Sequence, residues 1–319
     1  MKKVNLILAS LILFGLMTGC NGGASQITMT LKAEGNVMFA VGGNGTATID
    51  WGDGSPVKTV TLNPDAEQYE HHYAQSAEYT VQITGEGITL FKGCEIGITT
   101  LDVSRSSTLN ALICYSNQLK SLDVSKNAAL TALSCADNQL TALDVSKNAA
   151  LEELYCSVNQ LKSLDVSKNA ALRRLQCGEN LLMTLDVSAN TRMESLWCIG
   201  NSLTTLDVSK NTALTELFCF ENQLTSLDMS KNSLLERIDC NHNQLTSLIL
   251  KDNDQLYYLT CTDNQLSTKT LNALFQSLNN VSDEKAIYMI GNPGADDCDR
   301  SIAEKKAWRV EVYMDDDEW

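Results

Sequence analysis

Residues 130–150 read LTALSCADNQLTALDVSKNAA, and this unit of 21 residues recurs along most of the chain with the consensus LxxLxCxxNxLxxLDVSxNxx. A repeat that keeps a fixed step indicates a solenoid, in which each copy forms one coil and buries its apolar residues against the next coil. Full copies begin at Leu109, Leu130, Leu151, Leu172, Met193, Leu214, Leu235 and Leu256, and a degenerate copy begins at Ile88.

The unit resembles the leucine-rich repeat, in which LxxLxLxxN forms one strand and one asparagine turn. A cysteine takes the third apolar position, and in this the pattern is similar to the short repeats of the cysteine-ladder internalins and related bacterial surface proteins. The resemblance implies a mostly β leucine-rich repeat solenoid of about nine coils over residues 88–276. Because 21 residues leave little room for a helix, we expect narrow coils with extended segments on both sides.

Strand alternation predicts which side chains of each repeat face the core. It places Leu112 and Cys114 inward, and Ala111, Ile113 and Tyr115 outward. Cysteines of successive coils would then stack about 4.8 Å apart in one buried column. Their parallel orientation opposes disulfide geometry, so we interpret the thiols as small apolar groups, with disulfides or a metal as the alternatives. The column comprises Cys114, Cys135, Cys156, Cys177, Cys198, Cys219, Cys240 and Cys261.

Two further columns follow from the same register. Buried asparagine amides are expected to satisfy backbone groups in the turns, and the column comprises Asn117, Asn138, Asn159, Asn180, Asn201, Asn222, Asn243 and Asn264. Stacked carboxylates repel one another unless they are neutralised by a cation or by the lysines three positions later. Each coil offers only one Asp and one Ser, fewer oxygen ligands than calcium repeats provide, so we predict no metal and no cofactor. This column comprises Asp102, Asp123, Asp144, Asp165, Asp186, Asp207 and Asp228.

The outward positions around each strand vary between copies and hold most aromatic residues of the repeats. Aromatic side chains facing solvent favour contacts with a protein or a glycan. The alternative is that the rings only cover one another across neighbouring strands. Charged residues are interleaved with them, namely Glu153, Arg174, Glu216 and Asp239. The predicted ligand-binding residues are Tyr115, Tyr155, Trp197, Ile199, Phe218, Phe220, Arg237 and Tyr258.

The amino terminus has the pattern of an export signal. Lys2 and Lys3 precede an apolar stretch, Val4 to Met17, that is too short for a mature membrane-spanning helix. The sequence LMTGC at 16–20 resembles the bacterial lipobox, which implies cleavage before Cys20 and lipidation of its thiol. We therefore expect residues 1–20 to be a lipoprotein signal peptide and the chain to be lipid-anchored outside the cytoplasm, at the outer membrane or cell surface. The alternative is an ordinary cleaved signal in which Cys20 is incidental.

Residues 21–87 show short alternating runs separated by turn residues, which is typical of a β-sandwich. Trp51-Gly-Asp-Gly-Ser55 and His71-His-Tyr73 resemble a PKD-type immunoglobulin-like domain. The segment is short for that family, so one strand would be missing or shared with the adjoining repeats. Asp53 and His71 could form an acid/base pair. Because Asp-Gly is foremost a turn signal, we interpret them as structural residues of a spacer or accessory binding module.

Residues 277–319 are predicted to form a small α/β cap with an acidic tail. The repeat register breaks at Lys269, and Leu271, Leu274 and Phe275 follow helical spacing. Beyond them we expect a strand over 286–290 and a helix over 302–308 that leads into a last strand. Solenoids need such caps to cover the apolar end of the final coil.

The composition narrows the possible functions. The chain has 319 residues and a formal charge of −15, which argues against a nucleic-acid partner. With 3 histidines and inward cysteines, no nucleophile has a plausible histidine partner, so we predict no enzyme activity. The sequence predicts a binding or adhesion lipoprotein that recognises a protein or glycan through its strand face. The alternatives are a structural envelope protein without a ligand and an accessory binding module associated with a hydrolase.

Overall fold

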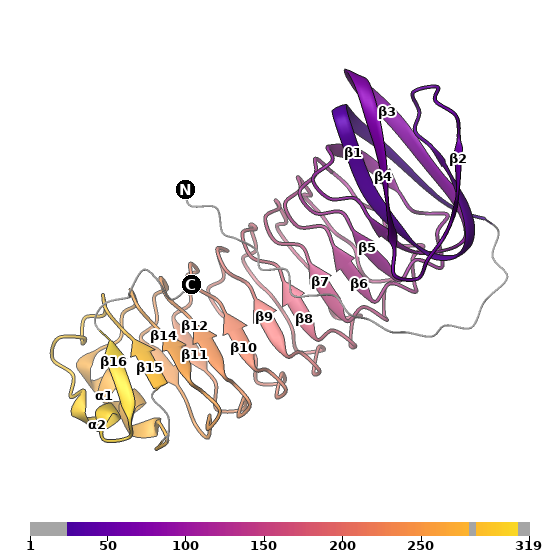
Figure 1. The fold of residues 1–319 in the computed structure, drawn as a ribbon. Coiled ribbons are helices and arrows are strands. Elements are labelled where there is room, and N and C mark those ends of the chain that lie inside the picture. The colour runs from indigo at the N-terminus through magenta and orange to yellow at the C-terminus, as the bar shows by residue number, and fades with distance from the viewer. Residues whose placement is uncertain (1–23, 281–284, 312–319) are drawn as a thin grey trace.

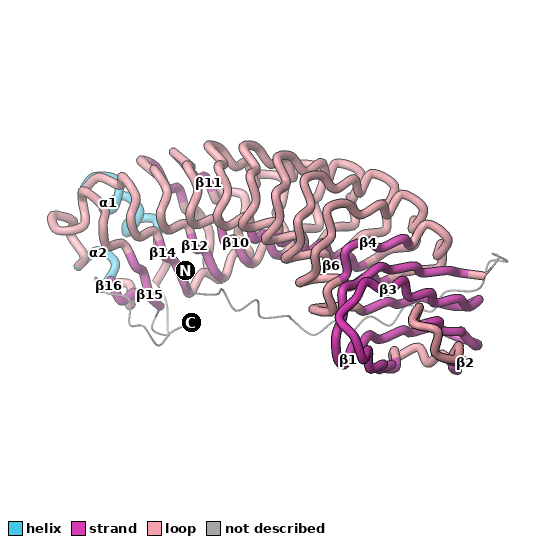
Figure 2. Tube along the Cα trace, turned by 90° about the horizontal axis from the view of Figure 1, so that it is seen from above, coloured by secondary structure: helices cyan, strands magenta, loops and turns pink. Residues whose placement is uncertain are grey.

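The computed structural model describes residues 24–280 and 285–311. It shows a solenoid with an antiparallel β unit at its N-terminal end and two helices at its C-terminal end (Figure 1). The coils stack side by side along an arc (Figure 2). The predicted signal segment, Cys20 and the acidic tail lie outside the described residues. Within the described part, no helix is long and apolar enough to cross a membrane.

Each full repeat contributes one short strand to a parallel sheet. Ala111 of one coil lies beside Ala132 of the next, so neighbouring strands pair with the shift of one repeat that the sequence predicts. The central residue of each strand is a buried Leu or Ile, and the flanking residues face outward. The strands are β5 Ala111–Ile113, β6 Ala132–Ser134, β7 Glu153–Tyr155, β8 Arg174–Gln176, β9 Ser195–Trp197, β10 Glu216–Phe218, β12 Arg237–Asp239 and β14 Tyr258–Thr260.

The second half of the coil is extended, as its LDVS pattern predicts. Two of these segments pair as a separate parallel sheet, β11 (Ser226–Asp228) with β13 (Ser247–Ile249). The corresponding segments that begin at Leu122, Leu143, Leu164, Leu185 and Leu206 form no ladder. Side chains and turns must therefore satisfy their polar groups.

The N-terminal unit consists of two long antiparallel strands, β1 (Ser25–Asp50) and β3 (Glu67–Lys92), with β2 (Lys58–Thr61) and β4 (Ile98–Asp102) paired to β1. The final residues of β3 then pair in parallel with β5, so that Leu90 lies beside Ala111. The unit thus supplies the first strand of the repeat sheet. Among the described residues this sheet has 14 strands and runs without interruption from β2 to β16.

One apolar core runs through the whole chain. Phe39 packs against Trp51 and Phe91 in the N-terminal unit, with ring centroids 5.0 and 5.9 Å apart. The core continues through the leucine rows and the cysteine column, whose members have no exposed surface. All eight column cysteines are free thiols in this structure and are buried among the leucine rows.

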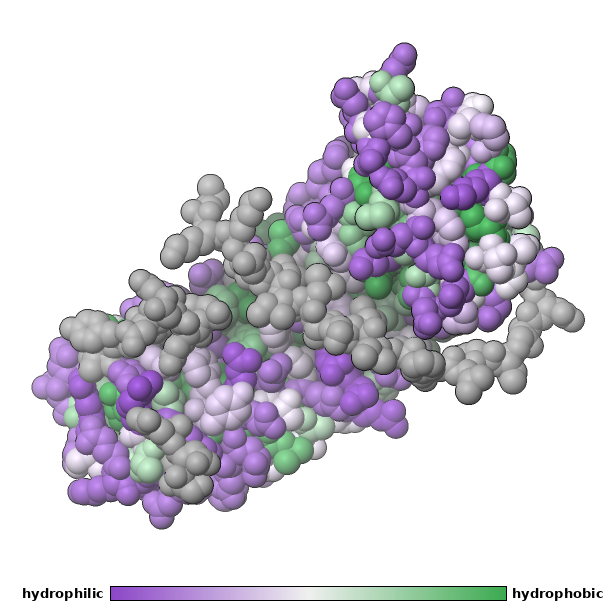
Figure 3. Space-filling model, viewed as in Figure 1, coloured by the Kyte–Doolittle hydropathy of each residue, from purple (hydrophilic) through white to green (hydrophobic). Residues whose placement is uncertain are grey.

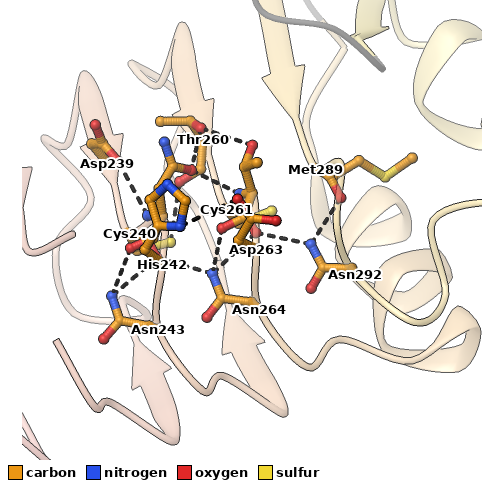
Figure 4. Close-up of polar contacts among 12 residues, drawn as sticks. Asp239, Cys240, His242, Asn243, Thr260, Cys261, Asp263, Asn264, Met289 and Asn292 are labelled. Atoms are coloured by element: carbon orange, nitrogen blue, oxygen red, sulfur yellow. Dashed lines mark hydrogen bonds and ion pairs between the residues drawn. The ribbon is translucent and has the colours of Figure 1, made fainter. Parts of the chain in front are cut away.

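The predicted asparagine column satisfies turn backbone groups, as expected. The Nδ2 group of Asn138 donates to the carbonyls of Cys114, Cys135 and Ala136, and its Oδ1 accepts from the amide of Leu119. The same pattern recurs in the other coils, and Figure 4 shows the row Asn243, Asn264 and Asn292 beneath the cysteines. Because Asn292 belongs to the cap, the ladder continues past the last full repeat.

A second asparagine column, which the consensus contains but to which we assigned no role, lies in the other half of the coil. Asn148 has no exposed surface, and its Nδ2 donates to the carbonyls of Val124 and Asn127, both in the preceding coil. The equivalent residues are Asn127, Asn169, Asn190, Asn211, Asn232 and Asn253. These amides supply the hydrogen bonds that the missing ladder would have made.

The aspartate column has a structural explanation. The Oδ1 atom of Asp144 accepts from the backbone amide of Ser146 at 2.8 Å, and the same turn occurs at Asp123 and Asp165. These hydrogen bonds stabilise the charged form and lower the pKa of each carboxyl. No group of side chains in the described ranges has the composition of a metal site.

The C-terminal segment extends the sheet instead of only covering it. Helix α1 (Thr268–Ser277) begins after Ser267, whose side chain caps the amide of Thr270, and it buries Leu271, Leu274 and Phe275. Strands β15 (Lys285–Tyr288) and β16 (Trp308–Glu311) then add to β14 in parallel, so the solenoid has about 10 turns where we expected about nine. Helix α2 (Ser301–Glu304) is shorter than the helix predicted over 302–308, because the chain turns at Ala307, where φ is 65°, into β16.

Candidate ligand-binding face

The strand face is the surface formed by the outward residues of β5 to β10, β12 and β14. Its residues fall into three rows: the first and last residue of each strand, and the residue after the following cysteine. Register places Glu216 beside Arg237 and Phe218 beside Asp239. Ala111 and Ile113, which we expected to face outward, have exposed fractions of only 8% and 6%. They lie between Leu90 and Lys92 of β3 on one side and Ala132 and Ser134 of β6 on the other.

Four of the predicted residues and one ring the sequence did not single out form a continuous cluster. Trp197 meets Phe218 edge to face, with centroids 4.9 Å apart. The guanidinium of Arg237 lies 5.0 Å from the centroid of Phe218 and 5.7 Å from that of Tyr258. Tyr258 in turn lies 5.8 Å from Tyr288 of β15. These side chains therefore support one another across five strands, from β9 to β15.

The other predicted residues lie apart from this cluster to different degrees. Ile199 and Phe220 are half-buried in the adjacent row of the same coils. Tyr155 lies two coils away, and its hydroxyl donates to Glu153 at 3.1 Å. Tyr115 lies four coils before Trp197, roughly 19 Å along the stack. The structure does not bring Tyr115 into the same site.

The charges of the strand face are mostly paired between neighbouring coils. Arg174 donates to Glu153 at 2.5 Å, and Arg237 lies 3.6 Å from Glu216. Burial and the nearby Glu153 carboxylate raise the pKa of Tyr155 well above its ordinary value. The pairs fix the first row of side chains in place, so they contribute order to the face more than they contribute stability.

Asp239 differs from the other charges because it is buried without an ion pair. Its exposed fraction is 2%, and its Oδ1 accepts from the backbone amide of Asn241 at 3.1 Å. Asn241 itself accepts from the amide of Thr262 at 2.7 Å and from the Thr260 hydroxyl. Burial raises the pKa of Asp239 to about 7. Figure 4 shows this polar cluster in the last coils of the strand face.

In the sequence, Asp239 stood out only as one of several charges. The strand register was sufficient to place it beside Phe218 on one side and Thr260 on the other. The sequence did not reveal that the position is buried, since burial depends on the size of neighbours in the assembled row. Tyr288 was missed because it follows the break in the repeat.

The three histidines make no contact typical of a catalytic nucleophile. His71 lies 2.7 Å from Asp53 and stacks on Trp51, so this pair is formed through the side chains and not through the backbone. Asp53 also accepts from the amide of Ser55, and both contacts lower its pKa. In the described ranges, none of the histidines is hydrogen-bonded to a serine or cysteine; His72 contacts Asn36, and His242 contacts Asp263.

The buried thiols are poor nucleophiles. Desolvation raises the pKa of every column cysteine well above its ordinary value, so the reactive thiolate is scarce at neutral pH. Cys94 and Cys298 are only partly buried. Burial raises the pKa of Cys94 to about 11.

The visible surface has no single broad apolar area outside the parts covered by grey atoms. In Figure 3, apolar residues of the N-terminal unit and the coils form small groups among polar ones. The most exposed apolar side chain of the coils is Met183, at 69%, on the second half of its repeat. The strand face is therefore distinguished by its ordered aromatic and arginine cluster more than by its apolar area.

No protein-family model matches the chain, and no curated protein does. Among solved structures, the functional domain of InlJ from Listeria monocytogenes, which includes a cysteine ladder, matches with a TM-score of 0.61 and 32% identity, over 72% of this chain and 56% of that chain. A second match is the leucine-rich repeat ectodomain of the receptor kinase GASSHO1/SCHENGEN3 from Arabidopsis thaliana, solved with CASPARIAN STRIP INTEGRITY FACTOR 2. Its TM-score is 0.51 and its identity is 19%, over 60% of this chain and 25% of that chain. The leucine-rich repeat domain of APL1 matches with a TM-score of 0.51 and 16% identity, over 64% of this chain and 63% of that chain.

The repeat strands, the asparagine turns and the cysteine column together define a leucine-rich repeat solenoid. Its structural neighbours include an internalin-type repeat domain with a cysteine ladder of its own. The chain spans about 56% of the length of that InlJ domain. Solenoids of this kind are scaffolds typical of protein–protein binding, which is an inference from the fold.

Proposed function

We propose that the chain is a non-catalytic binding protein that recognises a protein ligand through the strand face. One observation carries the proposal: Trp197, Phe218, Arg237 and Tyr258 hold one another in a fixed arrangement across adjacent coils. Trp, Tyr and Arg are the residues that most often dominate the binding energy of protein interfaces. Their mutual contacts reduce the side-chain entropy that binding would cost.

A protein ligand is favoured over a glycan because the aromatic faces of the cluster are covered by neighbouring side chains. Sugars stack on open aromatic faces, whereas Phe218 is only 8% exposed and carries the Arg237 guanidinium over its ring. The same guanidinium lies over Tyr258. What the cluster offers a ligand is therefore ring edges and the outer side of an arginine, which suits a protein surface.

The test is to screen the purified chain against arrays of surface proteins and of glycans, alongside the single variants Trp197→Ala and Arg237→Ala. Each variant should weaken a genuine protein ligand by roughly thirtyfold, the effect of losing about 2 kcal/mol at an interface hot spot. Met183→Ala is the matched control, because it removes a comparable apolar side chain from the other half of a coil. A ligand bound equally well by all four proteins would refute the strand-face proposal, and binding confined to the glycans would refute the protein-ligand part.

The location of the protein is a separate proposal. Export by residues 1–20 and a lipid on Cys20 would anchor the solenoid outside the cytoplasm, with the PKD-like unit as a spacer or accessory module. Mass spectrometry of the mature N-terminal peptide should find a diacylglyceryl-modified Cys20. An unmodified Cys20, or a mature chain that begins at another residue, would defeat this part and leave the binding proposal intact.

A further inference from the structure

Strand β16 (Trp308–Glu311) is the last strand of the long sheet, at its C-terminal end (Figure 1). It pairs in parallel with β15 on one side, and no strand within residues 24–280 and 285–311 pairs with its other side. A hollow of about 390 Å³ lies beside that outer side, lined by Glu304 and residues 307–310 and by no residue of β15. An open strand edge presents backbone donors and acceptors with which another strand can pair.

The hydrogen bonds of β15 show which backbone groups of β16 point to the open edge. In a parallel sheet, alternate residues direct their amide and carbonyl to opposite neighbours. The amide of Ala286 donates to a carbonyl next to β14, so Ile287 faces β16. Ile287 lies beside Val310, and the parallel geometry joins it to the backbone of Arg309 and Glu311. The amide and carbonyl of Val310 therefore point to the open edge.

The side chains of β16 are charged on one face and apolar on the other. Arg309 and Glu311 lie on the outward face, with Nε and Oε1 2.5 Å apart and with exposed fractions of 47% and 28%. Val310 lies between them in the chain, faces the other way and packs against the apolar core while only partly buried. A strand that pairs with this edge must match opposite charges outward and an apolar residue inward.

A second copy of β16 matches this pattern when the two strands run antiparallel about a twofold axis at Val310. The two Val310 residues then face each other and exchange both of their backbone hydrogen bonds. Arg309 of each copy lies opposite Glu311 of the other, at the close separation of a non-hydrogen-bonded pair. A shift of two residues in either direction would set Arg309 against Arg309 or Glu311 against Glu311, which is repulsive.

We propose that two copies of this chain pair through their β16 edges, antiparallel and about a twofold axis, into a dimer with one continuous sheet. Two identical patches that pair symmetrically form the commonest kind of dimer. The axis is perpendicular to the sheet, so the strand faces of both copies lie on the same side. Because β16 has only 4 residues, the interface is small and the dimer dissociates in the micromolar range. The pairing does not depend on what the strand face binds.

The experiment measures sedimentation velocity of residues 21–319, the chain without the predicted signal peptide. From about 1 µM to about 100 µM, wild type should shift from monomer to dimer. Arg309→Glu gives each copy two acidic residues on the edge, and Glu311→Arg gives two basic ones. Each variant alone should dimerise roughly thirtyfold more weakly than wild type, because two attractive pairs become repulsive.

An equimolar mixture of the two variants should dimerise again, since every pair across the axis then has opposite charges. Such a heterodimer would also show that both variants are folded. Val310→Pro should be monomeric over the same range, because proline lacks the amide that points to the open edge and not to β15. Lys58→Glu is the matched control, since it reverses a charge on β2 at the other end of the same sheet. It should leave the dimer unchanged.

Three results would overturn the β16 dimer: a wild type that stays monomeric, a dimer that neither charge reversal nor Val310→Pro weakens, and a mixture that stays monomeric. None of them bears on the strand-face proposal, which is tested by ligand binding to Trp197→Ala and Arg237→Ala.

Discussion

At the scale of single residues, a buried carboxylate links the stability of this protein to pH. The pKa of Asp239 is about 7 in the folded state, above its ordinary value of 3.8. The folded state therefore binds more protons than the unfolded state between about pH 4 and pH 7, and the free energy of unfolding falls as the pH rises through that window. The stabilisation present below about pH 4 is lost above pH 7.

Asp239→Asn should make the protein more stable at pH 8. One pKa unit corresponds to about 1.4 kcal/mol, so the ionised carboxylate costs up to about 4 kcal/mol that the amide does not. At pH 4 the wild-type carboxyl is neutral, and the two proteins should unfold at nearly the same urea concentration. Urea unfolding at both pH values checks this.

Asp207→Asn is the control for the pH prediction, since the Asp207 carboxyl accepts from the amide of Ser209 and its pKa is lowered. It should gain no stability at pH 8. An Asp239→Asn variant that is less stable than wild type at pH 8 would contradict the burial argument.

At the scale of the coil, each asparagine turn contains a residue with positive φ directly before the asparagine. Ser116, Asp137 and Glu179 adopt φ values of 53°, 51° and 49° there, and Gly200 adopts 60°. This conformation is costly for residues with a Cβ and most costly for β-branched ones. Val158 occupies it at φ 56°, and so its turn is the most strained of the series.

Val158→Gly should therefore stabilise the protein by about 1 kcal/mol, because glycine adopts positive φ without steric cost. The reciprocal change, Gly200→Val, should destabilise it by a similar or larger amount, since a Cβ there would lie 3.3 Å from Cγ of Glu179. The urea midpoints of the two variants should move in opposite directions from wild type. Equal or parallel shifts would show that the turn conformation is not the cause.

The repeat makes the interior of each coil predictable and its edges less so. The 21-residue step alone placed Cys114 against Cys135 and gave Asn138 its turn contacts, because every copy must satisfy the same neighbours. The role of Asn148 was missed because the second half-repeat resembles scaffold in the sequence and its missing ladder is visible only in the structure. On the strand face, the sequence named Trp197 and Phe218 but not their contact, since contacts between variable residues depend on side-chain orientation.

At the scale of the whole molecule, the sheet joins parts that the sequence divided. The break at Lys269 suggested a separate cap, yet β15 and β16 continue the parallel sheet. At the other end β3 belongs both to the N-terminal unit and to the repeat sheet. Pairing between segments without a repeat pattern cannot be found from periodicity, which explains why both junctions were missed or left open.

This architecture predicts that damage at one end opens the nearest coils first. In a solenoid each coil contacts mainly its neighbours, so a local defect spreads from its own position. Phe91 is fully buried at the junction of β3 and β5, and its replacement by alanine should cost roughly 3–5 kcal/mol there. In Phe91→Ala, Cys114 and Cys135 should therefore become reactive before Cys261.

Alkylation with iodoacetamide, read out by peptide mass spectrometry, measures that order. In native wild type we expect Cys94 and Cys298 to react first, because they are partly buried, and the eight column thiols to be protected. Phe275→Ala is the matched control at the opposite end, where the phenyl ring is also fully buried in α1. It should expose Cys261 before Cys114, and the same order in both variants would mean that the coils open as one unit instead of from their ends.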